Sequence, residues 1–117
     1  MNGKNYLKKK EGISNKNMNE KLHKELKTIA NRLRISIIEM LYKAKSGHPG
    51  GALSSADIIS VLYFGGILDV YPEKPYSLNR DIFILSAGHY CPVWYAALAY
   101  KGFFPIEELN TLRKFGS

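Results

Sequence analysis

The sequence has a single cysteine, Cys91, among its 117 residues. One cysteine cannot form an intramolecular disulfide, and no pair of cysteines offers the ligand spacing of a zinc site. These absences exclude a small secreted scaffold held together by disulfides and a zinc module of the usual kinds. They favour a reducing, cytoplasmic setting.

Long hydrophobic stretches are also missing. A helix that crosses a bilayer needs about 20 predominantly apolar residues, and no segment comes near that length. The first 20 residues lack the apolar centre of a signal peptide. The sequence therefore predicts no membrane partner. It is still 45% hydrophobic and 12% aromatic, which is enough for the core of one small domain.

Acidic residues are scarce only in the first part of the chain. Residues 1–50 hold 12 Lys and Arg against 4 Asp and Glu, whereas residues 51–117 hold 5 against 6. Residues 1–20 are polar and lack hydrophobic periodicity, which indicates a flexible basic leader. We expect one folded unit over residues 21–117.

A long helix is predicted after this leader. Apolar residues recur at steps of three or four from Leu22 to Ala44, the spacing of one buried helix face. The helix should end near Gly47, because glycine suits a helix end and Pro49 cannot continue it. The segment Gly47 to Leu53 carries three glycines and is predicted to be a loop with unusual backbone geometry.

A second helix and one strand are predicted next. Ser54 offers an N-cap for a helix that runs to about Phe64. Residues 81–86, Asp-Ile-Phe-Ile-Leu-Ser, contain a short apolar run typical of a strand buried on both faces. Because one strand cannot make a sheet, Ile82 to Leu85 should expose apolar surface.

Two further helices complete the prediction. Pro92 suits the first turn of a helix over residues 93–100, and Pro105 begins another that runs to about Lys114. The expected fold class is α/β, an incomplete fragment that is mostly helical with one buried strand.

Two histidines are candidates for chemistry. His48 lies in the glycine-rich segment, and His89 follows the predicted strand, where ligands of open α/β sheets bind. An imidazole held by a tight loop can donate or accept a proton at neutral pH. The residues alone leave a second interpretation open, in which both histidines are hydrogen-bonded surface or packing residues. His23, in the first turn of the long helix, is predicted to be solvated.

The other polar and aromatic candidates have structural interpretations. Cys91 at a helix start is expected to be a small packing residue. Trp94, Tyr95, Tyr100, Phe103 and Phe104 are expected in a core or interface rather than in a base-stacking platform. Helix caps, helix dipoles or strand ends account for Asp57, Asp81, Glu107 and Glu108.

The string Lys-Ala-Lys-Ser-Gly-His-Pro-Gly-Gly, from Lys43 to Gly51, resembles the amino-terminal signature of transketolases. The double glycine and the closing segment resemble the split transketolases of bacteria and archaea, in which separate amino- and carboxy-terminal subunits replace one chain. Further segments similar to the family follow in the same order: Ala56-Asp57-Ile58, Asn79-Arg80-Asp81, Ser86-Ala87-Gly88-His89, Glu107-Glu108-Leu109 and Leu112 to Ser117.

The resemblance implies transfer of a two-carbon ketol unit from a ketose phosphate to an aldose phosphate, with thiamine diphosphate and Mg²⁺ as cofactors. Residues 21–117 would be the amino-terminal part of the thiamine-diphosphate-binding domain, on its diphosphate side. His48 would contact the sugar substrate and help proton transfer at its hydroxyls, and His89 would approach the diphosphate. The implied partners are sugar phosphates and a carboxy-terminal transketolase subunit, in a homo- or hetero-oligomer.

The sequence departs from the family pattern at a few positions. Ala87 stands where the family often has Lys or Asn, and Tyr90 and Cys91 replace small residues, so that a bulky Tyr90 could crowd the cofactor. The family's third histidine motif and its Gly-Asp-Gly metal segment have no counterpart before Ser117. The Mg²⁺ ligands are therefore expected beyond this chain, and the isolated chain is expected to be inactive.

Two alternatives remain at the level of sequence. The lysine-rich leader and a pI near 9.5 fit a small basic nucleic-acid-binding or scaffold protein. Against it, 12 of the 14 aromatic residues lie in the nearly neutral residues 51–117, so that nucleic-acid binding is not expected. Another thiamine-diphosphate enzyme, such as deoxyxylulose-phosphate synthase or phosphoketolase, is the second alternative. The intact string from Ser46 to Gly51 favours transketolase.

Overall fold

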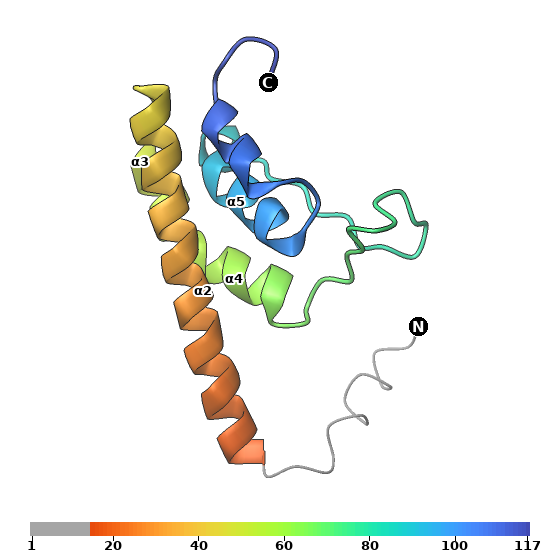
Figure 1. The fold of residues 1–117 in the computed structure, drawn as a ribbon. Helices are drawn as coiled ribbons and strands as arrows, with labels where there is room; N and C mark the ends of the chain where they lie inside the picture. The colour runs from red at the N-terminus through yellow and green to blue at the C-terminus, as the bar shows by residue number, and fades with distance from the viewer. Residues whose placement is uncertain (1–14) are drawn as a thin grey trace.

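The computed structural model describes the backbone of residues 15–117 and the side chains of residues 19–117. In Figure 1 the first helix is a long rod, and the other elements gather beside its upper half. No described helix combines the length and the hydropathy needed to cross a bilayer. The α-helices and the 3₁₀ helices (η) are α2 (Asn15–Ala44), α3 (Pro49–Ser54), α4 (Ala56–Phe64), η1 (Gly88–Tyr90), α5 (Cys91–Lys101) and η2 (Ile106–Thr111).

The long helix α2 confirms the predicted long helix. Its buried face carries Ala30, Leu33, Ile37 and Met40, which are spaced by three or four residues. The helix begins at Asn15, so residues 15–20 of the predicted leader are helical. The rest of that leader lies outside the described residues.

The short helix α3 replaces most of the predicted glycine loop. Pro49 stands in its first turn, and Ala52 is completely buried. Burial of that side chain against the core offsets the backbone entropy that the glycines cost, which propensity alone cannot show. Ser54 is not the N-cap of the second helix: it is the last residue of α3, and α4 begins at Ala56.

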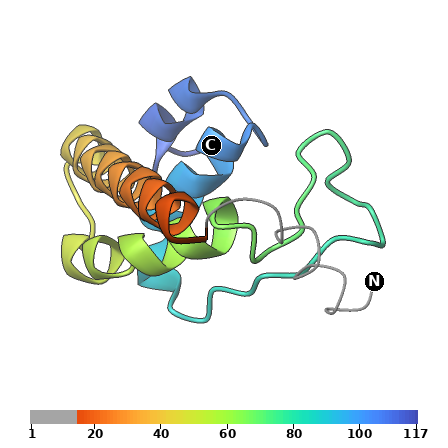
Figure 2. The same cartoon turned by 90° about the horizontal axis from the view of Figure 1, so that it is seen from below.

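The core lies where α2 crosses α4 and α5, as Figures 1 and 2 show. The prediction of α5 is confirmed: Pro92 stands in its first turn, and Gly102 ends it with a left-handed φ of +91°. The last predicted helix is a 3₁₀ helix, η2, which ends at Thr111 rather than near Lys114. Buried residues of α3, α4, α5 and η2 are Ala52, Ala56, Ile59, Ser60, Tyr63, Pro92, Val93, Ala96, Ala97, Ala99 and Leu109.

The predicted buried strand is wrong. Within the described residues no strand is found, and residues 81–85 form an extended connection. A strand requires a hydrogen-bonded neighbour, and an apolar run in the sequence does not supply one. Phe83 and Leu85 are half-buried, whereas Ile82 and Ile84 are 72% and 81% exposed. The expected exposure of apolar surface is therefore confirmed for the two isoleucines.

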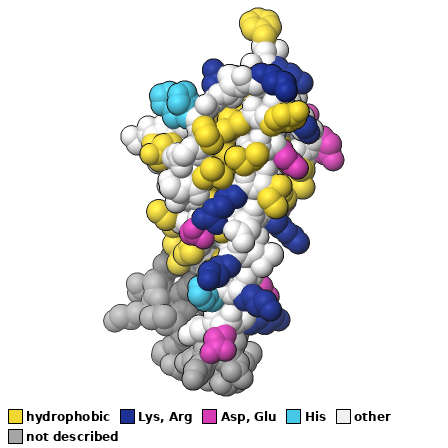
Figure 3. Space-filling model, turned by 90° about the vertical axis from the view of Figure 1, so that its left-hand side faces the viewer, with side chains coloured by type: hydrophobic (Ala, Val, Ile, Leu, Met, Phe, Trp, Pro, Cys, Tyr) yellow, Lys and Arg dark blue, Asp and Glu magenta, His cyan; other side chains and the backbone are white. Residues whose placement is uncertain are grey.

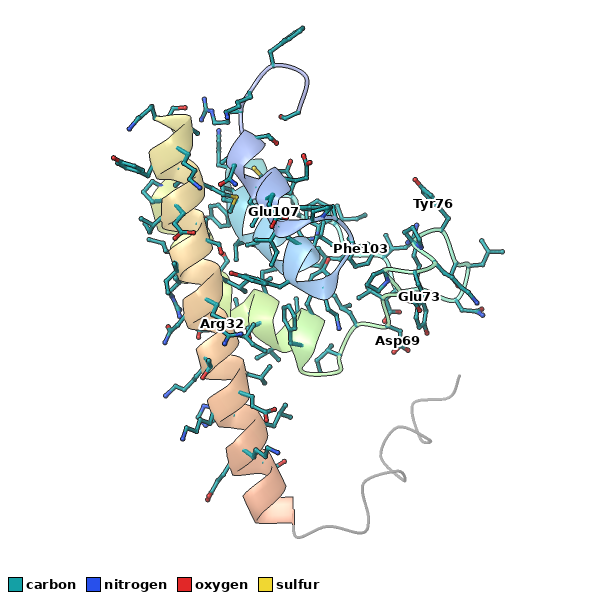
Figure 4. The ribbon with its side chains drawn as sticks, viewed as in Figure 1. Arg32, Asp69, Glu73, Tyr76, Phe103 and Glu107 are labelled. Atoms are coloured by element: carbon teal, nitrogen blue, oxygen red, sulfur yellow. The ribbon has the colours of Figure 1, made fainter. Side chains whose placement is uncertain are left out.

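A projecting segment, residues 69–81, precedes this connection and stands away from the helices (Figure 4, where Asp69, Glu73 and Tyr76 are labelled). The backbone N–H of Asp81 donates to the carbonyl oxygen of Asp69 at 2.8 Å. In return, the N–H of Asp69 donates to Oδ2 of Asp81 at 2.8 Å. The two bonds close the base of the segment and fix where the chain turns back toward η1.

Candidate functional site

His48 is the N-cap of α3, with an extended backbone (φ −123°, ψ 95°) and an exposed side chain. Gly47 before it has a φ of +138°, a conformation that side chains rarely adopt. A Cβ atom on Gly47 would lie 2.2 Å from Cδ2 of Leu41. Glycine at this position therefore allows the tight turn from α2 into α3, which brings His48 to the surface.

His89 lies in η1, between two points at which the chain packs against the core. On one side, Phe83 packs edge-on against Tyr63 and Trp94, with ring centroids 5.7 Å apart in both pairs. On the other side, Val93 in the first turn of α5 is completely buried. These contacts hold the short turn, while the imidazole of His89 is exposed.

The structure brings the two predicted site histidines together. The ring centroids of His48 and His89 are 4.5 Å apart, and the ring planes are tilted by 47°. Figure 3 shows a histidine group on the surface near the upper end of α2. Neither ring has a hydrogen-bond partner among the described residues. The pair thus offers imidazole nitrogens to water or to a ligand at one exposed place.

Residues 25–117 match the family described as transketolase, thiamine diphosphate binding domain. The chain belongs to this family. The resemblance found in the sequence is therefore confirmed, and the match lies within the predicted folded unit.

Relatives of this transketolase-family chain include subunits of divided enzymes. Over 93 residues it is 44% identical to one subunit of the apulose-4-phosphate transketolase of Phocaeicola vulgatus, covering 80% of this chain and 32% of that protein. Over 93 residues it is 42% identical to the 6-deoxy-6-sulfo-D-fructose transketolase subunit SqwG of Clostridium sp. (strain MSTE9), covering 80% and 34%. Over 92 residues it is 44% identical to the transketolase of Homo sapiens, covering 79% and 15%. The chain thus spans about a third or less of the length of these relatives.

Tyr90, whose bulk was noted in the sequence, packs against α3. A Cβ atom on Gly51 would lie only 1.8 Å from Cε1 of Tyr90, so the phenol ring lies directly on the glycine backbone. Tyr90 is half-buried and also packs against the core. Sequence reasoning missed this contact, although the double glycine and the unusual tyrosine were both visible.

Cys91 is a free, half-buried cysteine at the start of α5. Burial raises the pKa of the Tyr95 hydroxyl. Neighbouring Cys91 raises this pKa further, through its charge and through hydrogen bonding. Cys91 and Tyr95 thus lie one helical turn apart on α5. This arrangement agrees with the interpretation of Cys91 as a packing residue.

The carboxylates considered in the sequence have structural positions, and two of them have partners. Asp57 forms an ion pair with Arg34, which joins α4 to α2. Asp81 accepts from the backbone of Asp69, and the first turn of η2 contains Glu107 and Glu108. Among the described residues, no group of three or more His, Cys, Asp or Glu side chains could hold a metal ion.

Two aromatic residues of α5, Trp94 and Tyr100, pack against the core. Trp94 donates through Nε1 to the hydroxyl of Tyr63 at 2.6 Å, and the hydroxyls of Tyr100 and Ser36 are hydrogen-bonded at 2.8 Å. Burial raises the pKa of Tyr63, and the hydrogen bond from Trp94 opposes part of that rise. These bonds agree with the core interpretation of Trp94 and Tyr100. His23 is exposed, as predicted, but it does not lie in the first turn of the long helix, because α2 begins eight residues earlier, at Asn15.

Proposed function

We propose that this chain supplies the diphosphate-side wall of a thiamine diphosphate site in a transketolase, which transfers a two-carbon ketol unit from a ketose phosphate to an aldose phosphate. The observation that carries the proposal is the contact between His48 and His89, 4.5 Å between ring centroids, in a chain of this family. Two imidazoles from separate elements form one exposed polar site. Such a site can donate hydrogen bonds to anionic oxygens and exchange protons with hydroxyl groups.

The chemistry of the two side chains fits the cofactor. A diphosphate presents anionic oxygens, and an imidazole N–H can donate a charge-assisted hydrogen bond to one of them. His89 is assigned to this contact because it lies just before the start of α5, where the partial positive charge of a helix favours an anion. When bound, thiamine diphosphate supplies a thiazolium that stabilises a carbanion.

His48 is assigned to the sugar side. Its ring contacts that of His89, and its nitrogens have no partner among the described residues. The imidazole can therefore accept a proton from a sugar hydroxyl or return one to it. Its position at the N-cap of α3 holds the side chain at the end of a regular element.

Other parts of the site are assigned outside the described residues. Mg²⁺, which the family resemblance implies, would be bound by other groups of the assembled enzyme. Two of the relatives are named as subunits, which supports assembly of this chain with a second, carboxy-terminal subunit. The exposed position of both imidazoles also fits a site that a second wall completes.

A chimaera tests the proposal. Residues 25–117 of this chain replace the matched stretch of the Phocaeicola vulgatus protein, and ketol transfer is assayed with the companion subunit of that enzyme. We expect thiamine-diphosphate-dependent turnover to be retained, because the family match covers the whole replaced stretch. A chimaera that folds and assembles but transfers no ketol unit would reject the proposed function.

A further inference from the structure

The contact between the two histidines needs a structural cause, because no hydrogen bond holds it. His48 and His89 lie on α3 and η1, and their rings touch without any other partner among the described residues. Two exposed rings can stay in contact only if the backbones that carry them are held at a suitable separation. The packing of α3 against η1 therefore decides how far apart the imidazoles lie.

One pair of residues makes this packing close. Tyr90 directly follows His89, and Gly51 lies in the first turn after His48. A Cβ atom on Gly51 would lie 1.8, 2.3 and 2.4 Å from Cε1, Cδ1 and Cζ of Tyr90. All three distances are far below van der Waals contact, so only glycine leaves room for the ring. A rigid aromatic ring thus rests on backbone rather than on a movable side chain.

The glycine backbone is itself anchored. Its carbonyl oxygen accepts hydrogen bonds from the Ser55 hydroxyl at 2.8 Å, the Ser54 hydroxyl at 3.0 Å and the Ser55 backbone N–H at 3.2 Å. Next to Gly51, Ala52 is completely buried. The surface on which Tyr90 packs is therefore fixed to the core and to the end of α3.

We propose that Gly51 and Tyr90 are positioning residues: the phenol ring, packed on the glycine backbone, fixes η1 against α3 and so sets the spacing of the His48 and His89 imidazoles. The inference rests on the proposed function for its consequence, since that spacing would align the sugar side of the site with its diphosphate side. It also accounts for a bulky residue directly after His89. The ring of Tyr90 fills the space that the missing side chain of Gly51 leaves open.

The test uses the full 117-residue chain and an NMR readout. The nuclear Overhauser effect between the ring protons of His48 and His89 reports their contact, and circular dichroism reports folding. We expect Gly51→Ala to lose this signal. Gly50→Ala is the matched control: it changes the neighbouring glycine of the same helix, where a Cβ atom meets nothing within 4 Å. A folded Gly51→Ala chain with an undiminished signal would overturn the proposal.

Variants of Tyr90 decide the matter if Gly51→Ala does not fold. Tyr90→Phe keeps the ring and should keep the histidine signal, whereas Tyr90→Ala removes the ring without any clash and should lose it. A signal retained in a folded Tyr90→Ala chain also overturns the proposal. Titration with inorganic pyrophosphate tests the proposed function separately. Unmoved His89 resonances would reject the diphosphate role of His89. The result on the spacing of the two histidines would not depend on that titration.

Discussion

The ring of His48 is exposed, and the sugar-side role proposed for it predicts that its loss affects turnover more than cofactor affinity. In the chimaeric enzyme we expect His48→Ala to lower kcat by about 10²- to 10⁴-fold, the usual loss for one positioned acid–base group. Thiamine diphosphate affinity, measured by calorimetry, should stay within a few fold. Tyr76→Ala, at a residue that is 90% exposed on the projecting segment, is the control.

His89 should give the opposite pattern. Replacing it with alanine would remove the hydrogen bond that we propose it donates to the diphosphate, and we expect this loss to weaken cofactor binding by about 1–3 kcal/mol. Turnover should recover at saturating cofactor. Steady-state kinetics over a range of thiamine diphosphate concentrations measure both quantities. Unchanged affinity together with a lower melting temperature would assign His89 a purely structural role.

At the residue scale, the sequence indicated which residues are candidates for the site, but it did not indicate which of them touch each other. His48 and His89 could be selected because each stands beside glycines at the end of a regular element. Their proximity could not be predicted, because it depends on how α3 packs against η1. Tyr90 shows the same limit: its size was noticed in the sequence, but its position against Gly51 is a tertiary contact.

The contact between α4 and α5 should be sensitive to alkaline pH. Burial raises the pKa of Tyr63 above its ordinary value of 10.0, so the folded state holds the phenol proton more tightly than the unfolded state. The stability that this gives is present below pH 10.0 and is lost as pH rises through the folded-state pKa. We expect the free energy of unfolding, followed by Trp94 fluorescence, to fall above that pH.

Tyr63→Phe is the matched variant for the alkaline prediction. It keeps the ring in the core but removes the titrating hydroxyl that accepts from Trp94. Its stability at neutral pH should be lower by about 1 kcal/mol, the net value of one hydrogen bond. Its decline above pH 10.0 should be shallower; an equally steep decline would mean that other groups cause it.

Elements with a strong repeating pattern were predicted well, and elements that depend on neighbours were not. The apolar spacing of α2 and the proline and glycine at the two ends of α5 are local signals. In contrast, α3 contains two glycines and owes its helix to the burial of Ala52. Residues 81–85 carry the composition of a strand but have no strand beside them in the described chain.

The molecule as a whole leaves large hydrophobic side chains uncovered. Figure 3 shows such side chains gathered on the face along α2. Exposed examples on α2, on α4 and in the extended connection are Ile35, Ile38, Tyr42, Ile58, Val61, Ile82 and Ile84. Surface of this kind favours association, because burying it removes apolar area from water.

Ile82 and Ile84 lie two residues apart in the extended connection and are 72% and 81% exposed, so we expect them to contribute to such association. We expect the double variant Ile82→Ser/Ile84→Ser to weaken self-association by about a hundredfold, because covering two isoleucine side chains is worth roughly 3 kcal/mol. Sedimentation velocity over a range of concentrations measures the effect. Tyr76→Ser is the control for a change at an exposed side chain elsewhere. Equal association of both variants would place the cause outside the extended connection.

The projecting segment lends itself to grafting. Its two ends, Asp69 and Asp81, are joined to each other by a pair of 2.8 Å hydrogen bonds, so the loop is closed at its base in addition to the turns that it contains. Extra residues in a closed loop cost little, since loop entropy rises only slowly with length. We therefore expect the protein to fold with a peptide epitope or a fluorophore acceptor sequence inserted after Tyr76. The insertion should leave His48 and His89 in their positions at α3 and in η1.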